Sequence, residues 1–480
     1  MIMLGSTQTV QPKHFARAKS LYFLTWRWHF YAGLFVIPFM LMLSLTGIVM
    51  LFDDELESIR YGDILVVEPA DSRIAVSEQL ALVKQEYGGA TVTQFIPAAS
   101  DTSPNRFNVR LANGSNLLIL VNPYNGDILG KINRDDSWYA LANEIHSTLL
   151  VGDVGDYLIE ISSSLSIVLL VTGIYLWLPS DNASKAGFLK IRSQSGVRIF
   201  MRDLHANLGG VLSLVLLFFL VSGLAWSGVW GGKFVQPWSS FPAQKWADVP
   251  LSDETHASLN HGAEEEVPWG LEKTPLPEST GHEHHGGHAG HQTDEPAQFA
   301  STVSIDDIVA TASKLGMTQY QLNLPKSETG VFTLGANTMS GDITDPTQDR
   351  TTHIDQYSGE ILADVTWDDY NWMAKFMAAG IALHTGEVSI INKLLNVFFC
   401  IAFIAVCVTG VVMWWKRRPA GKKTLGAPPP FEKSGIWKLG AVTMVLVGFA
   451  FPLAGATIVT VLILDALLMK ATPKLHNWFA

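Results

Sequence analysis

Four long stretches without a charged residue constrain this 480-residue chain more than any other feature. They are residues 30–52, 161–178, 204–232 and 394–415. A helix needs about 20 apolar residues to cross a bilayer, so we predict four transmembrane helices. Charged residues make up 16% of the chain, against about 25% in soluble domains, which argues against an ordinary soluble enzyme. A fifth uncharged stretch, residues 439–464, contains Pro452 and is compatible with one kinked helix or a hairpin.

Lysine and arginine are unevenly distributed between the segments that join these stretches. The N-terminal tail, residues 179–203 and residues 416–438 are basic, the last including Lys416-Arg417-Arg418. Residues 53–156 carry 16 acids and seven basic residues, and residues 231–389 carry 23 acids and seven. The positive-inside rule therefore predicts cytoplasmic basic segments and two acidic outer segments. The net charge of −11 belongs to the outer segments and gives no indication of nucleic-acid binding.

The chain repeats its pattern in two halves. In each half a histidine opens the first membrane helix, at His29 and His205, and is followed 18 residues later by the glycine of a hydroxyl–Gly pair. The second helices repeat the scheme with longer gaps of 27 and 26 residues, from His146 to Thr172-Gly173 and from His384 to Thr409-Gly410. Two matched spacings indicate an internal duplication.

The outer segments also match each other. Residues 121–129 resemble residues 354–362, and both predict a β-hairpin with a Tyr and a Gly–acid turn. A short amphipathic helix precedes each, at residues 76–87 and 305–315. Each outer domain is then a small α+β unit of about 60 residues, a size that is marginal for independent folding. We therefore expect the membrane helices to brace it.

The Trp-x-Trp-His-x-x-x-Gly opening at residues 26–33, the tyrosine hairpins and the duplication resemble the PepSY-associated transmembrane family. The resemblance covers nearly the whole chain. It implies an iron-regulated protein of the bacterial inner membrane, in a family that includes haem b reductases of ferric siderophores. The chain departs from the family pattern by an insert at about residues 241–300 and by its C-terminal apolar region.

Taken together, these features predict a polytopic α-helical membrane protein with an internal duplication. Its expected fold has four core transmembrane helices, a C-terminal helix or helical hairpin, and two small periplasmic α+β PepSY domains. The expected segments are a cytoplasmic tail (1–28), helix 1 (29–52), a periplasmic region with the first PepSY-like domain (53–156), helix 2 (157–178), a cytoplasmic loop (179–204), helix 3 (205–230), a periplasmic region (231–388) with the insert and the second PepSY-like domain (about 301–370), helix 4 (389–415), a cytoplasmic loop (416–434), the C-terminal region (435–470) and a cytoplasmic tail (471–480).

Four histidines are candidate haem ligands. The topology puts His29 and His205 at the cytoplasmic starts of their helices, and His146 and His384 on the outer side just before theirs. An isolated interfacial histidine is usually a helix cap, but four at duplicated positions form one pair at each face and predict two bis-His haems. No CxxCH motif occurs, so the haem is expected to be non-covalent haem b. Two haems can relay electrons across a hydrocarbon core of about 30 Å.

Other residues have weaker signals. Arg27 and Arg202 lie beside the cytoplasmic pair and are candidates for haem propionate contacts, with positive-inside anchoring as the alternative. The glycines expected to leave room for haem are Gly33, Gly47, Gly209, Gly210 and Gly223. A histidine-rich tract reads as a loose divalent-metal site or a solvated linker, and consists of His282, His284, His285, His288 and His291. The sequence indicates no catalytic side chain.

We therefore expect a di-haem b transmembrane oxidoreductase, a membrane ferric (siderophore) reductase for iron acquisition. It would carry electrons from a cytoplasmic or quinol donor to a periplasmic ferric siderophore or other metal chelate. No P-loop or Rossmann fingerprint occurs in a credible context for ATP or nicotinamide. Two alternatives stay open: a non-enzymatic metal-handling membrane protein, and a PepSY protein that regulates a peptidase.

Overall fold

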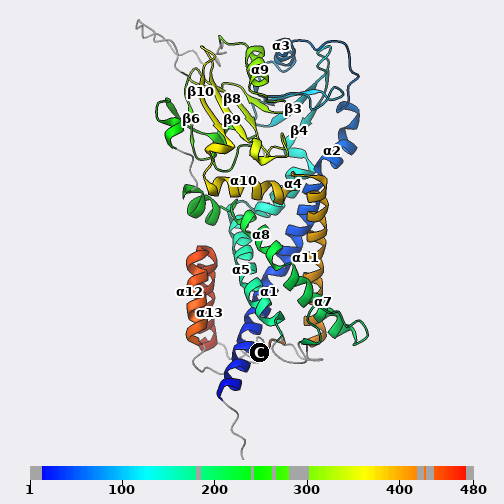
Figure 1. Cartoon of the computed structure of the whole chain (residues 1–480), viewed down its shortest axis with the longest axis vertical. Helices are drawn as coiled ribbons and strands as arrows, with labels where there is room; N and C mark the ends of the chain where they lie inside the picture. The colour runs from blue at the N-terminus through cyan, green and yellow to red at the C-terminus, as the bar shows by residue number, and fades with distance from the viewer. Residues whose placement is uncertain are drawn as a thin grey trace, which may run out of the picture. The chain divides into compact units, whose positions relative to one another are not determined.

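The computed structural model describes residues 13–179, 185–238, 243–261, 266–279, 302–418, 426–428 and 437–471. These residues divide into two compact units (Figure 1). The helical unit is drawn from residues 1–45, 146–234 and 398–480, and the sheet unit from residues 46–145 and 235–397. Each unit is assembled from segments that are far apart in the sequence.

The helical unit is built from apolar helices. The described helices that lie in it or enter it are α1 (Lys13–Leu51), α5 (Asp153–Trp177), α7 (Val197–Val211), α8 (Ser213–Leu224), α11 (Ile390–Arg417), α12 (Trp437–Ala450) and α13 (Pro452–Ala471). In the described part of the chain, three stretches are long and apolar enough to cross a membrane: Leu21–Leu51, Asp153–Trp177 and Ile390–Arg417. The pair α7 and α8 counts as a fourth only if the two helices form one bent span.

The four segments share one apolar core. Its buried side chains are Val36, Met40, Leu170, Leu220 and Cys407, which come from α1, α5, α8 and α11. The core shows that helices from both halves of the chain pack together, and it positions the histidines described below.

The third predicted membrane helix, residues 205–230, is not one continuous helix. It is divided between α7 and α8, which bend by 59° relative to each other. The bend follows Gly210, where an added Cβ would lie 2.2 Å from the Trp177 ring of α5, so only glycine fits. The Ser213 hydroxyl donates to the Gly210 carbonyl over 2.8 Å and satisfies a group near the break. Gly210 therefore makes room for a tryptophan rather than for haem.

Other helix ends also differ from the predicted segments. α1 begins at Lys13, inside the predicted tail, and α5 begins at Asp153 rather than at residue 157. Asp153 and Asp156 lie in the first turn of α5, where acidic side chains stabilise the helix dipole. The apolar run locates a membrane helix, but polar end residues extend it.

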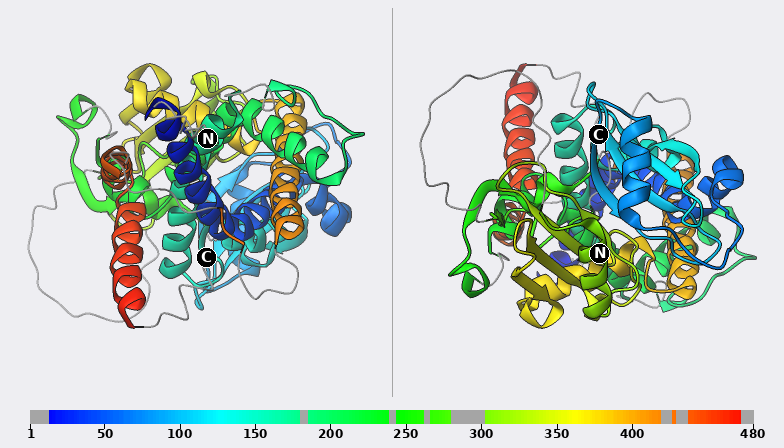
Figure 2. Two further views of the ribbon diagram at one scale, coloured as in Figure 1. Left: turned by 90° about the horizontal axis from the view of Figure 1, so that it is seen from below. Right: turned by 90° about the horizontal axis from the view of Figure 1, so that it is seen from above.

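The C-terminal apolar region forms two helices. α13 begins at Pro452, a residue favoured at the first helical position. The helices α12 and α13 contact each other (Figure 2). Their close approach needs glycine, because a Cβ on Gly455 would lie 2.6 Å from Cα of Gly448. Trp230 stacks on Phe451 with ring centres 6.0 Å apart and connects this pair to the rest of the helical unit.

The sheet unit contains one eight-stranded antiparallel sheet in the order β10-β9-β8-β7-β1-β2-β3-β4. The strands are β1 (Thr91–Ile96), β2 (Asn105–Arg110), β3 (Asn116–Val121), β4 (Ile128–Asn133), β7 (Gln321–Asn323), β8 (Val331–Ala336), β9 (Arg350–Asp355) and β10 (Ile361–Thr366). Helix α3 (Val76–Glu86) precedes the first four and α9 (Ile305–Lys314) precedes the last four. The predicted amphipathic helices and hairpins are therefore confirmed.

The two α+β repeats join through β1 and β7, with Gln94 opposite Asn323 and Phe95 opposite Leu322. Side chains of both repeats and of α3 and α9 form a single core, which includes Val83, Phe95, Phe107, Ile308, Leu322, Leu334 and Ile354. A unit of about 60 residues buries too little surface to be stable alone, and sharing a core doubles its size. The two α+β segments thus brace each other.

The remaining elements of the sheet unit lie around this sheet. They are α2 (Asp53–Tyr61), α10 (Trp372–Thr385), β5 (Leu251–Thr255) and β6 (Pro275–Pro277), and α4 (Trp138–Thr148) runs from this unit into the helical unit. The described part of the insert packs apolar side chains on β10 and α10, with Trp246, Leu259 and Leu271 against Val365 and Ala374. The histidine-rich tract of residues 282–291 lies outside the described residues.

Candidate functional site

The structure brings His29 of α1 and His205 of α7 together inside the helical unit. Their ring centres lie 6.2 Å apart and the ring planes are perpendicular. The two residues are 176 positions apart, and they occupy equivalent places in the two halves of the chain. The packing of α1, α5, α8 and α11 around one core produces this meeting.

The His29 ring is held by the second membrane helix of its own half. Nδ1 of His29 lies 3.0 Å from the Thr172 hydroxyl on α5. The hydroxyl donates its own hydrogen to the Val168 carbonyl over 2.7 Å, so its oxygen accepts from Nδ1–H. Gly173 leaves room for the ring, since a Cβ there would lie 3.1 Å from Cε1 of His29.

His205 is held in the same way by α11. Its Nδ1–H donates to the Val406 carbonyl over 2.9 Å, with the Thr409 hydroxyl 3.3 Å away. The Thr409 hydroxyl donates to the Ala405 carbonyl over 2.7 Å. A Cβ on Gly410 would lie 3.4 Å from Cε1 of His205. The Thr-Gly pairs, which the sequence showed only as markers of the repeat, are therefore the residues against which the two imidazoles pack.

These contacts fix the tautomer of both rings. The Val406 carbonyl can only accept, and the Thr172 hydroxyl has given its hydrogen to Val168, so Nδ1 carries the hydrogen in each imidazole and Nε2 keeps its lone pair. No hydrogen bond reaches either Nε2 within the described residues. A metal-ligating histidine has this arrangement, because its second nitrogen is usually held by a carbonyl or carboxylate that orients the ring.

The ring separation suits one metal ion between two imidazoles. Two metal–nitrogen bonds of about 2.0–2.1 Å, each with about 1.1 Å from nitrogen to ring centre, put the centres about 6.3 Å apart. The observed separation is 6.2 Å. No three His, Cys, Asp or Glu side chains converge on a metal position in the described parts of the chain. A donor set of two neutral imidazoles fits a haem iron, whose other four ligands come from the porphyrin.

The two arginines predicted beside this pair are already engaged. Arg202 donates to Asp203 over 2.9 Å, and Asp203 also accepts from Arg192 over 2.8 Å. Arg27 donates to the Tyr31 hydroxyl over 3.2 Å and to the Pro428 carbonyl. Neither guanidinium is therefore the best placed to bind a carboxylate of a ligand.

The other predicted histidines lie at the ends of short helices. His146 is in the last turn of α4 and His384 in the last turn of α10, so each comes just before α5 or α11, as predicted. The His384 carbonyl accepts from Asn396 Nδ2 over 2.9 Å, which ties α10 to α11 within the sheet unit. His146 belongs to the helical unit and His384 to the sheet unit. Their pairing stays a prediction.

The backbone after His146 is strained. Leu149 and Leu150 have φ of 53° and 61°, in the left-handed region that side chains with a Cβ rarely adopt. Such strain persists where surrounding structure enforces it, and it is enriched at functional sites. It also turns the chain tightly, because a Cβ on Gly155 would lie 1.6 Å from the Thr148 carbonyl oxygen. His146 is thus placed by a rigid connection.

The sheet unit contains a second histidine pair that the sequence did not indicate. Nε2 of His256, in the insert, lies 2.9 Å from Nε2 of His353 on β9, and both residues are fully buried. His256 Nδ1–H donates to the Thr274 carbonyl over 2.7 Å, so its Nε2 accepts from His353. Burial lowers the pKa of His256 to about 4. The pair therefore stays neutral and fastens the insert to the sheet.

A buried ion-pair network lies in the same unit. Glu266 of the insert is 2.7 Å from Arg134 and accepts from His261 Nδ1 over 2.7 Å. Burial by itself raises the pKa of Glu266, but the charges of Arg134 and His261 outweigh it and hold the pKa at about 2. The Glu266 carboxylate is therefore ionised and structural.

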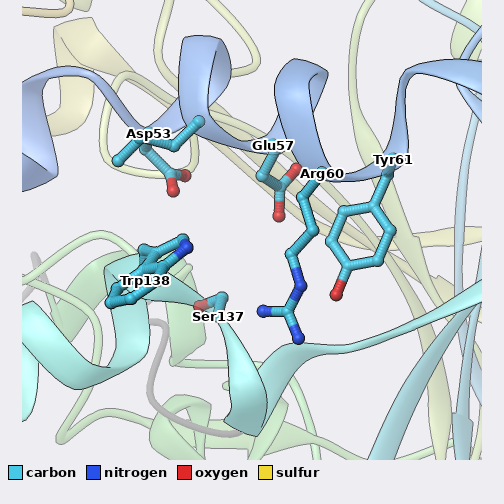
Figure 3. A pocket seen from close by; sticks show the side chains of 7 residues that line it. Asp53, Glu57, Arg60, Tyr61, Ser137 and Trp138 are labelled. Atoms are coloured by element: carbon cyan, nitrogen blue, oxygen red, sulfur yellow. The ribbon is translucent and has the colours of Figure 1, made fainter.

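A small pocket opens between α2 and the start of α4. It is lined by Asp53, Leu56, Glu57, Arg60, Tyr61, Ser137 and Trp138 (Figure 3). Burial and neighbouring acids raise the pKa of Asp53 to about 7. Arg60 is paired with Asp136 over 3.1 Å. The lining has no imidazole, so the pocket does not offer a bis-His ligand set.

The family model described as the PepSY-associated TM region matches residues 26–417, which include every histidine of the two candidate pairs. No curated protein matches the chain.

Proposed function

The chain belongs to the PepSY-associated transmembrane family, and from this membership and the imidazole geometry we propose that it is a di-haem b oxidoreductase. It would take electrons from a cytoplasmic protein or a quinol and deliver them to a periplasmic ferric siderophore or other metal chelate. In the proposed topology the chain is an internal duplication in the bacterial inner membrane, with α7 and α8 as the fourth span. The N-terminus is cytoplasmic and the sheet unit periplasmic.

The observation that carries the proposal is the His29/His205 centre. Nδ1 of His29 is oriented by Thr172, and Nδ1 of His205 by the Val406 carbonyl and Thr409, so each Nε2 keeps a lone pair. The 6.2 Å between the ring centres is close to the about 6.3 Å expected for two imidazoles on opposite sides of one iron.

A bound haem would supply one-electron transfer at its iron. The residues of this chain do the remaining work. Thr172 and Thr409 hold the imidazoles in one tautomer, and the apolar core around Val36 and Leu170 packs the helices that carry these threonines. Fixed ligands would need little rearrangement during electron transfer.

We extend the proposal to His146 and His384 as ligands of a second haem on the periplasmic side. Their equivalent places at the ends of α4 and α10 support this assignment. Two haems are required because one cannot bridge a hydrocarbon core of about 30 Å.

The experiment is a visible spectrum of protein purified from haem-replete cells. We expect a reduced b-type spectrum and two haems per chain. His146→Ala and His384→Ala should each remove one haem and leave the other, and a ferric chelate should reoxidise the reduced protein. A colourless preparation would overturn the proposal in favour of metal handling or peptidase regulation. If His29→Ala and His146→Ala removed the same haem, the pairing by membrane face would be wrong.

For the histidine-rich tract, residues 282–291, we propose divalent-metal binding outside the haem sites, on the basis of its composition. Deleting residues 281–291 should lower the Zn²⁺ bound in equilibrium dialysis and leave the haem content unchanged. Loss of a haem on deletion would show that a ligand had been misplaced.

A further inference from the structure

Arg417 ends α11, and its guanidinium lies against the turn of α1 that carries His29. Its Cζ atom is 5.0 Å from the centre of the Trp26 ring and 4.9 Å from that of Phe30. Trp26 and Phe30 flank His29 in the sequence, three residues before it and one after it. The two rings therefore hold the guanidinium beside the candidate centre by cation–π contacts.

Two nitrogens of Arg417, Nε and Nη2, are buried and have no hydrogen-bond partner in the described part of the chain. They lie on one edge of the guanidinium, the edge that a carboxylate can engage with two parallel hydrogen bonds. The charge that acts on Arg417 is a second cation, Arg198. Buried charged donors without an acceptor are unfavourable, so this edge is suited to an anion with two oxygens.

The other arginines nearby differ in this respect. Arg27 and Arg202 have acceptors, as described above, whereas Arg198 and Arg418 are exposed and their donors can reach solvent. The Arg418 guanidinium also lies over the Trp415 ring, with 5.1 Å from Cζ to the ring centre. Sequence analysis treated Lys416-Arg417-Arg418 as one positive-inside cluster. In the structure Arg417 differs from Lys416 and Arg418 because its Nε and Nη2 are buried and have no acceptor among the described residues.

We propose that Arg417 binds a propionate carboxylate of the haem held by His29 and His205. This inference rests on the proposed function, because it takes haem as the group between the two imidazoles. Arg417 follows Gly410, which contacts the His205 ring, by two turns of α11, or about 10 Å along the axis. A propionate extends over a distance of that order from the iron. A phospholipid headgroup has the same anion chemistry, but the free edge of Arg417 is buried.

The first test compares Arg417→Met, Arg417→Lys and Arg418→Met in the full-length protein. Haem loss is measured as transfer to apomyoglobin, and the midpoint potential of each haem is measured by redox titration. We expect Arg417→Met to release one haem about tenfold faster or more, because hydrogen bonds to a charged group are lost. Arg417→Lys should be intermediate, because an ammonium keeps the charge but not the paired donors. Arg418→Met should behave as the unmodified protein.

The second test changes the haem, and its main comparison uses the unmodified protein. Protein made in haem-deficient cells is reconstituted with haem or with haem dimethyl ester, whose propionates are esterified. We expect the unmodified protein to release the ester faster than haem from one of its two sites. Arg417→Met should release both at the same rate from that site. Equal release of haem and ester from the unmodified protein would overturn the assignment even if Arg417→Met failed to fold.

Failure of this inference is distinguishable from failure of the proposed function. If His29→Ala lost a haem while Arg417→Met released haem at the original rate, Arg417 would not be a propionate contact although the centre stood. If Arg417→Met lost co-purified phospholipid and kept its haem kinetics, the anion would be a lipid phosphate. If His29→Ala kept both haems, the centre itself would be refuted.

Discussion

His29 and His205 in the helical unit and His256 and His353 in the sheet unit are both pairs of imidazoles joined from distant parts of the chain. In the first pair the ring centres are 6.2 Å apart, and in the second they are 4.9 Å apart. In the first, each Nδ1 is held by a neighbouring helix. In the second, the two Nε2 atoms are bonded to each other over 2.9 Å.

The two histidine pairs differ in whether the lone pairs of their ring nitrogens accept a hydrogen bond. In the sheet unit the lone pair of His256 Nε2 accepts from His353, and the Thr333 hydroxyl donates to His353 Nδ1 over 2.9 Å. An ion between those two nitrogens would need about 4 Å, so the pair must break before it can bind metal. In the helical unit both lone pairs remain. We call the His256/His353 pair the latch, because it fastens the insert to the sheet. Burial and proximity alone do not distinguish a ligand site from such a latch, whereas the hydrogen-bond partners do.

The largest expected effect is that substitutions in the two pairs have different consequences: loss of haem for the first pair and lower stability for the second. His29→Ala or His205→Ala should each remove one of two haems, because a bis-imidazole site that loses one ligand retains its iron poorly. His353→Ala should keep both haems but destabilise the sheet unit by about 1–3 kcal/mol, because it leaves His256 Nε2 unsatisfied. The measurements are haem content per protein and thermal unfolding in detergent.

His29→Ala and His205→Ala act as controls for each other, since each half supplies one ligand to the same site. Different spectra for the two single variants would mean that the two rings do not share an iron. Loss of haem in His353→Ala would remove the distinction between ligand site and latch.

A smaller effect is expected from the residues that hold the rings. Thr172→Val and Thr409→Val keep the shape of the side chain but remove the hydroxyl beside Nδ1. Loss of such an outer partner lowers metal affinity by about 10- to 100-fold. Haem release to apomyoglobin should therefore be faster in both variants. Thr347→Val, an exposed substitution in the sheet unit, is the matched control. Unchanged release in both helical variants would show that the threonine hydroxyls do not orient the rings.

Local patterns in the sequence predicted much of this fold. The amphipathic helices and the two tyrosine hairpins were predicted correctly, because period, turn glycine and pairing partner all lie within a few residues. Gly126 and Gly359 have φ of 80° and 73°, as such turns require. The repeat also predicted that His29 and His205 would meet.

Features that depend on distant contacts were not predictable. Strand β7 has three residues, too few to show a period, yet it joins the repeats into one sheet. The bend between α7 and α8 depends on Trp177 of another helix. His256 and His353 are 97 residues apart and carry no spacing signal. The role of Arg417 appears only when its open donors and the rings of α1 are seen together.

The His256/His353 pair should respond to pH. Burial holds the pKa of His256 at about 4 and lowers that of His353 below the ordinary value of 6.5. Their stability contribution is therefore present above pH 6.5 and is lost as the pH falls toward 4, because the opened state takes up protons first. Hydrogen exchange of residues 251–277 should show protection falling on the order of tenfold between pH 7 and pH 5.

The comparison is with the double variant His256→Asn/His353→Asn, after correction for intrinsic exchange. Asp342 and Asp349, whose pKa burial raises to about 7, act in the opposite direction over this range. They are present in both proteins and cancel in the difference. Equal pH dependence in the two proteins would show that the imidazole pair is no latch.

The smallest expected effect separates the two rings of the ligand site. A Cβ on Gly173 would lie 3.1 Å from Cε1 of His29, whereas one on Gly410 would lie 3.4 Å from Cε1 of His205. Gly173→Ala must therefore displace the His29 ring by a few tenths of an ångström, and Gly410→Ala leaves ordinary contact.

Because Thr172 holds Nδ1 of the same ring, the displacement in Gly173→Ala should tilt His29 and move Nε2. The expected result is a few-fold faster haem release and a shifted midpoint potential in Gly173→Ala, with both values close to the original in Gly410→Ala. Each substitution also favours its helix by about 1 kcal/mol, so lower stability cannot account for faster release. Identical haem release from the two variants would mean that the space beside His29 and the space beside His205 differ less than the contact distances indicate.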